Sequence, residues 1–406
     1  MIRYFLLCLL CVNPAWAEEA PDKRYDVTFS ATFLPKKGMV EARISVQQSS
    51  HLLRLVDLDA AEPKFSNFAA DGSIEHAGKR LLWRVPATGG ALSYTARVDH
   101  QRGDYMDARM TGHWAIVRLD DIFPSARVRS RVGAASRSVL ELHGPAGWRF
   151  ESRYRVTGGA IIVDEPERRF DRPNGWLVAG KLGIRREFIA HRKVAVAAPA
   201  GQGMRRMDII AFLRWTLPRM VKVFPDFPDR LLIVGAMDDM WHGGLSGPGS
   251  VYLYADLPLI SENATSPLLH ELVHTASRTA GKPREDWIIE GLAEYYGLEI
   301  LRRSGGISKK RFKQTMQQLA GWVAREKGKL TSPSSGANTA RAVLLFNGIQ
   351  DELRQHDAGS LDSVVRKLMA ADTIGSGQLL ILVETALGAR SETLRQALAQ
   401  DMSAAK

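Results

Sequence analysis

The stretch "HELVHTASRTAGKPREDWIIEGLAEYY", from His270 to Tyr296, places two histidines four residues apart, with a glutamate directly after the first. In an α-helix the residues at i and i+4 lie on one face, so the imidazoles of His270 and His274 project side by side. Neutral imidazole nitrogens at about 2 Å in tetrahedral geometry suit zinc. The spacing therefore predicts a zinc site, with Glu271 beside the metal, where it can take a proton from a water at the metal.

Helix-boundary signals on both sides of the histidines predict a helical hairpin. Ser266 is a good N-cap, and Pro267 fits the first helical position, where a missing N–H costs nothing. Gly281 is a natural residue just after a helix end, and Pro283 prevents continuation. A second helix is expected to begin near Asp286, another good cap, and to pack antiparallel to the first. Two polar surface helices are the alternative, but they do not require these caps and this helical phase together.

The second helix carries two further acidic residues at positions that suit a metal site. A catalytic zinc needs a third protein ligand and an open position. Glu290 lies four residues after Asp286, and at about 1.5 Å per residue its height along the hairpin differs from that of His274 by about one turn. We therefore expect Glu290 to be the third ligand. Glu294, one turn further on, is placed to hold a ligand histidine by its other ring nitrogen, and one zinc per chain is the predicted cofactor.

The motif as a whole resembles that of a known enzyme family. His270-Glu271-x-x-His274 followed by "WIIEGLAEYY" resembles the gluzincin metallopeptidases of clan MA, most closely the glycyl aminopeptidase group. The third ligand in that family is the glutamate of a W-x-x-E-G-x-A-x-Y segment, and the matching positions here are Trp287, Glu290, Gly291, Ala293 and Tyr295. The resemblance implies a zinc peptidase with a thermolysin-like catalytic domain, Glu271 as general base, and peptide or protein substrates.

The sequence departs from the family at the residue that stabilises the oxyanion. Similar enzymes use a tyrosine downstream of the second helix, but no tyrosine follows Tyr296, and Thr339 occupies the corresponding stretch. His242, Tyr252 and His356 are possible substitutes, and each is also explained as a structural or exposed residue. The identity of the oxyanion donor therefore stays open.

A second departure concerns recognition of the substrate's amino end. In "MWHGGLSGPGSVYLY", Ser246 stands where aminopeptidases of this kind carry a glutamate. Gly243 and Gly244 suit a close approach of backbone, and the strand that follows could pair with an extended peptide. Aminopeptidase and endopeptidase activity both stay open. The alternative function is that of a catalytically impaired, metallopeptidase-like envelope protein that binds peptides or a protein partner.

The first 17 residues have the layout of a secretory signal peptide. Arg3 precedes an apolar run from Tyr4 to Val12, and the Ala15-Trp16-Ala17 segment is a typical cleavage site. The run is too short to span a bilayer, and no later segment is long and apolar enough to do so. We therefore expect an exported protein without a membrane span after signal removal, periplasmic in a Gram-negative organism.

The remaining chain predicts an α+β architecture. Residues 18–181 alternate polar and apolar with frequent turn signals, which predicts an antiparallel β-sandwich-like domain. Residues 182–303 are assigned to the gluzincin catalytic domain and residues 304–406 to a helical domain. Helical periodicity extends over 205–224, where Pro218 is expected to kink or interrupt the helix. Further helices are expected over 267–280, 286–303, 308–327, 339–355, 361–371, 377–387 and 391–402.

Charge and cysteine usage exclude some classes of protein. The formal net charge is +11, but the basic residues are scattered and no nucleic-acid-binding module is present, so a nucleic-acid partner is not expected. The two cysteines, Cys8 and Cys11, both fall in the predicted signal peptide. The mature protein would therefore have no disulfide and would depend on core burial for stability.

Overall fold

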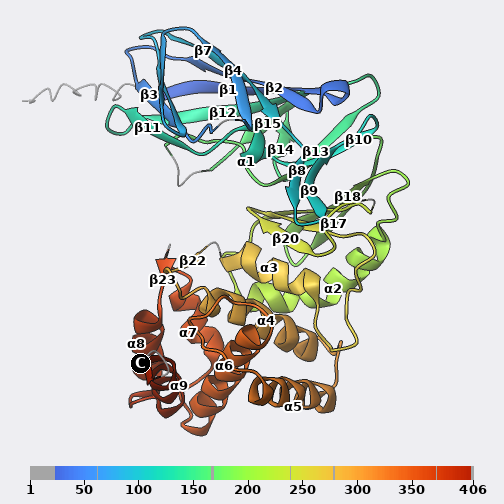
Figure 1. Ribbon diagram of the computed structural model, residues 1–406, viewed down its shortest axis with the longest axis vertical. Coiled ribbons are helices and arrows are strands. Elements are labelled where there is room, and N and C mark those ends of the chain that lie inside the picture. Colours follow the sequence, from blue (N-terminus) through green and yellow to red (C-terminus); the bar gives the residue numbers. More distant parts are fainter. Residues whose placement is uncertain are drawn as a thin grey trace, which may run out of the picture.

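The computed structural model describes residues 23–61, 63–165, 169–237, 239–277, 279–371 and 373–403, so the predicted signal peptide lies outside the described residues. Figure 1 shows a β-rich part, built by the first half of the chain, above a part in which helices dominate. The predicted α+β fold, with a β-rich N-terminal domain and a helical C-terminal part, is therefore confirmed. Among the described residues, no helix combines the length and the apolar character that crossing a bilayer requires.

The β-rich part consists of three sheets. Side chains alternate between buried and exposed along its longest strands, as Tyr25, Val27 and Phe29 show, because one face of each sheet covers the core. Its strands are β1 (Arg24–Leu34), β2 (Met39–Gln47), β3 (Leu53–Leu58), β4 (Phe65–Ala70), β5 (Ser73–Ala77), β6 (Arg80–Arg84), β7 (Gly89–Arg97), β8 (His100–Arg102), β9 (Tyr105–Met110), β10 (Trp114–Arg118), β11 (Ala126–Ser130), β12 (Ala135–His143), β13 (Arg149–Ser152), β14 (Arg155–Thr157), β15 (Ala160–Val163) and β16 (Trp176–Gly180). Two short helical turns, η1 (Pro35–Lys37) and α1 (Leu119–Ile122), interrupt them.

Pairing within these sheets is largely antiparallel, as the turn-rich sequence predicts. The sheet orders are β14-β15-β12-β1-β2-β7-β4, β11-β3-β6-β5 and β13-β16-β10-β9-β8. One pair, β1 with β12, is parallel. A parallel pair needs a long connection, and the intervening strands supply it.

The second part of the chain begins with a mixed sheet. Its strands are β17 (Leu182–Ile189), β18 (Arg192–Pro199), β19 (Arg230–Val234), β20 (Gly244–Gly247) and β21 (Ser250–Leu253), in the order β17-β18-β19-β21-β20. Strands β18, β19 and β21 run parallel, whereas β17 and β20 are antiparallel to their neighbours. Strand β20 is therefore an edge strand, and Figure 1 shows it directly beside α3.

Helix α2 (Arg206–Val223) connects β18 to β19 and corrects one expectation. Pro218 does not interrupt it, because the helix is continuous on both sides of the proline. Leu213, Leu217 and Met220 are fully buried in the core between the helix and the sheet. Burial of these side chains offsets the backbone hydrogen bond that proline removes.

The remaining helices share one core with α2 and the mixed sheet. They are α3 (Pro267–Ser277), α4 (Trp287–Arg303), α5 (Lys309–Arg325), α6 (Ala337–Gln355), α7 (Leu361–Leu368), α8 (Ser376–Leu387) and α9 (Glu392–Ser403), with a small bridge between β22 (Ala280–Gly281) and β23 (Thr373–Ile374). Helix α4 lies at the centre, where Trp287 and Tyr295 pack against Phe346 of α6. The predicted domain boundaries after residues 181 and 303 stay predictions.

A separate apolar cluster joins the β-rich part to the mixed sheet. Trp114 and Trp176 from the β-rich part are buried with Leu232 and Tyr252 from β19 and β21. The rings of Trp176 and Tyr252 lie 5.5 Å apart. Because these side chains exclude water across the seam, strand β20 and the residues of the β-rich part beside it are held in a fixed relation.

Candidate metal centre

The helix that carries the two histidines begins where the sequence predicts and ends earlier. The hydroxyl of Ser266 accepts the backbone N–H of Leu269 at 3.3 Å, and Pro267 is the first helical residue. The helix stops at Ser277, not near residue 280, so Gly281 is not its terminating residue. Gly281 instead lies in β22, whose pairing with β23 takes the chain out of the helix.

The second helix also begins as predicted, but Asp286 does not cap it. The Asp286 carboxylate makes no hydrogen bond to the first turn of α4 and accepts the backbone N–H of Ser334 at 3.4 Å instead. The break between α3 and α4 is fixed by Glu285, which accepts the backbone N–H of Ser376 at 3.1 Å. The C-terminal helices therefore hold the turn of the hairpin.

Three predicted ligands converge between α3 and α4. The Nε2 atoms of His270 and His274 are 3.1 Å apart, and each lies 3.5 Å from one carboxylate oxygen of Glu290. Among the described residues, these three side chains form the group whose ligand atoms all lie within 4.8 Å of one another. The site is half-buried, and the Glu290 side chain, 35% exposed, is its most open member.

The spacing of these atoms fits a tetrahedral zinc ion. Ligands at about 2.0–2.1 Å from a tetrahedral centre are about 3.4 Å apart, which is close to the three separations here. Two imidazoles and one carboxylate are also the donor set of a catalytic zinc that keeps a fourth position open. The residues present therefore fit the metal.

Glu294 fixes the orientation of the first histidine. Its Oε2 atom lies 3.1 Å from Nδ1 of His270, so a proton on Nδ1 is donated to this carboxylate and the lone pair of Nε2 faces the metal site. Burial lowers the pKa of His270, but hydrogen bonds to Glu290 and Glu294 outweigh it and raise this pKa to about 10. For Glu290, burial raises the pKa, and the two histidines lower it further than burial raises it. The metal-free cluster therefore holds a proton where a cation would lie.

The remaining predicted residues lie on strand β20 or next to it. A Cβ atom added to Gly244 would lie 2.4 Å from Cγ of Glu271, so the glutamate side chain rests directly against this glycine. Gly243 precedes β20, and its carbonyl accepts the backbone N–H of Tyr254 at 3.0 Å. Ser246 lies two residues further along β20 than Gly244. The structure therefore brings Gly244 to Glu271 and places Gly243 and Ser246 on the same strand segment.

The three possible oxyanion donors have different surroundings. Tyr252 is fully buried, and its hydroxyl donates to the carbonyl of Trp241 at 2.9 Å. His242 is exposed and stacks between the rings of Tyr105 and Tyr254, with centroid distances of 4.1 Å and 4.3 Å. His356 is an exposed residue at the C-terminal end of α6, the helix that also carries Thr339. These contacts explain Tyr252 and His356 as structural or surface residues.

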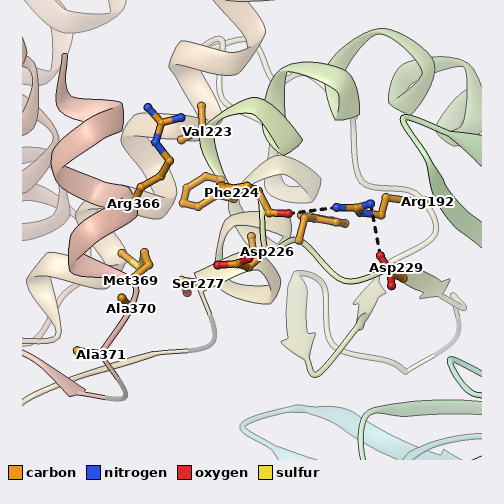
Figure 2. Close-up of a pocket in the computed structure, with 13 residues that line it drawn as sticks. Arg192, Val223, Phe224, Asp226, Asp229, Ser277, Arg366, Met369, Ala370 and Ala371 are labelled. Atoms are coloured by element: carbon orange, nitrogen blue, oxygen red, sulfur yellow. Dashed lines mark hydrogen bonds and ion pairs between the residues drawn. The ribbon is translucent and has the colours of Figure 1, made fainter. Parts of the chain in front are cut away.

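Two pockets lie apart from the metal ligands. One, of about 530 Å³, lies between the ends of α2, α3 and α7, with Arg192 and Arg366 on opposite sides (Figure 2). It reaches Ser277, less than one turn beyond His274 along α3. A second, of about 400 Å³, lies between β13 and the start of β18 and β19. Neither lining includes His270, His274 or Glu290, so both pockets are separate from the ligand cluster.

Two residues of the β-rich part contact β20 although no sequence pattern predicted them. Nη1 of Arg118 donates to the carbonyl oxygen of Ser246 at 3.3 Å, and Nε1 of Trp176 donates to that of Leu245 at 2.9 Å. Both residues are more than sixty positions away from β20 along the chain. No local pattern signals such contacts, because they arise from the seam between the β-rich part and the mixed sheet.

Comparison with known proteins agrees with this geometry. A sequence profile of the M61 glycyl aminopeptidases matches residues 268–357, which extend from the first turn of α3 to just beyond α6. No curated protein sequence matches the chain. The matched segment contains His270, His274 and Glu290.

Solved structures with the same fold cover nearly the whole chain. An aminopeptidase N family protein from Idiomarina loihiensis has a TM-score of 0.66 at 14% identity, covering 92% of this chain and 73% of that one. A mutant two-domain M1 zinc metallopeptidase bound to L-tryptophan has a TM-score of 0.60 at 14% identity, covering 93% of both chains. Aminopeptidase A from Legionella pneumophila, in complex with aspartic acid, has a TM-score of 0.53 at 12% identity, covering 93% of this chain and 49% of that one.

These comparisons agree with the arrangement of α3, α4 and the mixed sheet. The profile match covers the helices that bring the ligands together, and the structural matches extend the same fold over the β-rich part. Over residues 268–357 the chain is similar to the M61 glycyl aminopeptidases, and over nearly its whole length it shares the fold of the solved M1 aminopeptidase structures.

Proposed function

We propose that this zinc metallopeptidase is exported and hydrolyses peptide bonds with Glu271 as general base. The observation that carries the proposal is the convergence of His270, His274 and Glu290 within 4.8 Å, with Glu271 on the adjacent position of α3. A purely structural zinc site usually closes with four protein ligands and has no need of a base. Three ligands with a carboxylate beside them are the arrangement that metal-assisted hydrolysis requires.

Four side chains bind and orient the metal in this proposal. His270, His274 and Glu290 would hold one zinc ion, and Glu294 keeps the Nε2 lone pair of His270 directed at it. Zinc, when bound, supplies Lewis-acid polarisation of the substrate carbonyl and lowers the pKa of a water molecule. Half-burial of the cluster strengthens these electrostatic effects, because the local dielectric constant is lower than in bulk water.

Glu271 transfers the proton of the reaction. Its carboxylate accepts a proton from the water as the water oxygen forms a bond to the carbonyl carbon. It then gives this proton to the amine nitrogen, and the C–N bond breaks. The Glu271 side chain occupies the space where a Cβ atom of residue 244 would lie, and only a glycine leaves that space open. Close contact with the Gly244 backbone then restricts the movement of Glu271. The carboxylate is therefore held between α3 and the edge strand, where a peptide would bind.

An extended peptide is the substrate form that the open edge favours. Strand β20 is the edge of its sheet, so its outward backbone groups can pair with another strand. The N-terminal segment, with an apolar run and an Ala-x-Ala site, supports export and a periplasmic location in a Gram-negative organism.

The test combines metal content with hydrolysis of a broad library of peptides. We expect about one zinc per purified chain by elemental analysis. Glu271→Gln should keep the zinc and lower kcat by at least about a hundredfold, because a positioned base contributes roughly 10²–10⁴ in rate. His274→Ala should lose the zinc and the activity together.

A catalytically impaired, peptide-binding protein is the second candidate. It is favoured by Tyr252, whose hydroxyl is committed to the Trp241 carbonyl, and by the lack of any tyrosine after Tyr296 in the sequence. Equal, poor hydrolysis by the zinc-loaded wild type and by Glu271→Gln, together with measurable peptide binding by both, would establish this second function instead.

A further inference from the structure

One backbone edge of β20, the edge strand beside the metal site, pairs with no other strand in the described part of the chain. Because the Tyr254 N–H donates to the Gly243 carbonyl, alternation along the antiparallel pair assigns the backbone groups of Leu245 and Gly247 to β21. The N–H and C=O groups of Gly244 and Ser246 therefore point away from β21. A strand that pairs with β20 would bind to these groups.

A cation from the β-rich part already occupies one end of this free edge. Nη1 of Arg118 donates to the outward carbonyl of Ser246 at 3.3 Å. The guanidinium also lies 5.7 Å from the centre of the Trp176 ring, which holds it in place. Its side chain is 35% exposed, so the remaining N–H donors are accessible to a ligand.

The charge around Arg118 is not balanced by the nearest acid. Asp120 lies 3.7 Å from Nε of Arg118, but it also accepts a hydrogen bond from Arg172 at 3.3 Å and one from the Gly175 N–H at 2.9 Å. Two guanidinium groups thus share one carboxylate. The Ser246 end of the edge consequently carries a net positive charge.

The position of this charge relative to the reaction follows from strand geometry. Gly244 lies against Glu271, and Ser246 is two residues further along, about 7 Å away. A peptide paired with β20 therefore brings to Arg118 a group about two residues from the bond that is cleaved. A free amine there would meet like charge, whereas a carboxylate would gain a charge-assisted hydrogen bond.

We propose that Arg118 is a specificity-determining residue that selects a substrate carboxylate at the Ser246 end of β20. This inference rests on the proposed peptidase function and names its substrate class. The carboxylate belongs either to an aspartate or glutamate side chain or to the free C-terminus of a short peptide. Because the Ser246 side chain is uncharged, the charge of Arg118 determines which substrate group binds at this end of β20.

Hydrolysis of matched peptides tests the selection. Peptides that differ only in having Glu, Gln or Lys at each position around the cleaved bond are compared, each with a free or an amidated C-terminus. We expect wild type to prefer Glu over Gln at one position by about 10- to 100-fold in kcat/KM, the range of a charge-assisted hydrogen bond. Preference for the free C-terminus over the amide, without a preference for internal Glu, identifies the terminal carboxylate as the source.

Substitution of the arginine separates recognition from a structural role. Arg118→Gln should bring the Glu-to-Gln ratio to about one, Arg118→Lys should keep part of it, and Arg118→Glu should favour Lys. Arg186→Gln, which breaks the ion pair with Glu151 at the opposite edge of the sheet, should leave the ratio unchanged. If Arg118→Gln instead lowers hydrolysis of acidic and neutral peptides equally, the arginine only positions β20 and the inference is wrong.

Peptide binding provides a readout that does not depend on hydrolysis. Zinc-loaded Glu271→Gln should bind the acidic peptide about 10- to 100-fold more tightly than the neutral one, and adding Arg118→Gln should remove the difference. Arg118-dependent binding without any hydrolysis by wild type would reject the proposed peptidase function, and would show that Arg118 selects a carboxylate in a bound peptide that is not cleaved. Hydrolysis that does not depend on Arg118 would support the proposed function and reject the role given to Arg118.

Discussion

At the scale of single residues, the metal site is a cluster of ionisable groups whose charges depend on one another. His270 lies between Glu290 and Glu294, and these carboxylates raise its pKa to about 10 although burial alone would lower it. The resulting stabilisation of the metal-free fold is fully present below the ordinary value of 6.5 and is lost as the pH rises towards 10.

Zinc affinity should therefore depend on pH. Because zinc must displace the proton on His270, we expect its affinity to rise about tenfold per pH unit between 6.5 and 10. Competition with a chromogenic chelator at several pH values in this window measures the slope. Glu294→Gln removes a carboxylate that raises the pKa of His270, so the slope should flatten at a lower pH than in wild type. Above that pH, zinc affinity should be about 10- to 100-fold lower than in wild type, because the imidazole has lost the carboxylate that orients it. An unchanged slope in Glu294→Gln would show that this carboxylate does not hold the histidine.

At the scale of helices and strands, the contact between α3 and β20 depends on one missing side chain. A Cβ atom at position 244 would lie 2.4 Å from Cγ of Glu271, a distance that requires a shift. Gly244→Ala should therefore displace Glu271 and lower kcat about 100-fold, while zinc content stays near one per chain. Gly247→Ala is the matched control on the same strand, since its nearest atom would be the Ser250 hydroxyl at 3.3 Å. Equal losses in the two variants would contradict the role given to Gly244.

Local sequence signals predict only part of the helices and strands around the site. The start of α3, the phase of its histidines and the start of α4 follow from local signals, because caps and periodicity act within a few residues. The end of α3 does not, because the pairing of β22 with β23 depends on residues about ninety positions away. Contact between Arg118 and Ser246 is missed for the same reason, as its two residues are separated by 128 positions. Where local signals allow more than one helix end, long-range contacts determine which one forms.

At the scale of the whole molecule, the metal site depends on the C-terminal helices. Gly291 of α4 packs so closely on α6 that a Cβ atom there would lie 2.4 Å from Cβ of Ala342. The rings of Trp287 and Phe346 stack with centroids 6.1 Å apart, and Phe346 is fully buried. Because Trp287 opens the helix that carries Glu290, packing against α6 sets the position of the third ligand.

Removing the Phe346 side chain should therefore weaken zinc binding as well as the fold. We expect Phe346→Ala to lower the free energy of unfolding by about 3–5 kcal/mol, the range for truncating a buried phenylalanine. Zinc release, followed by a fluorescent chelator during denaturation, should move to lower denaturant concentration together with the loss of helical circular dichroism. Trp322→Ala, at a side chain that is 39% exposed, should change the midpoint far less. If zinc release in Phe346→Ala kept the wild-type midpoint while helicity was lost earlier, the ligands would be held independently of α6, and the helical hairpin would be sufficient for the site.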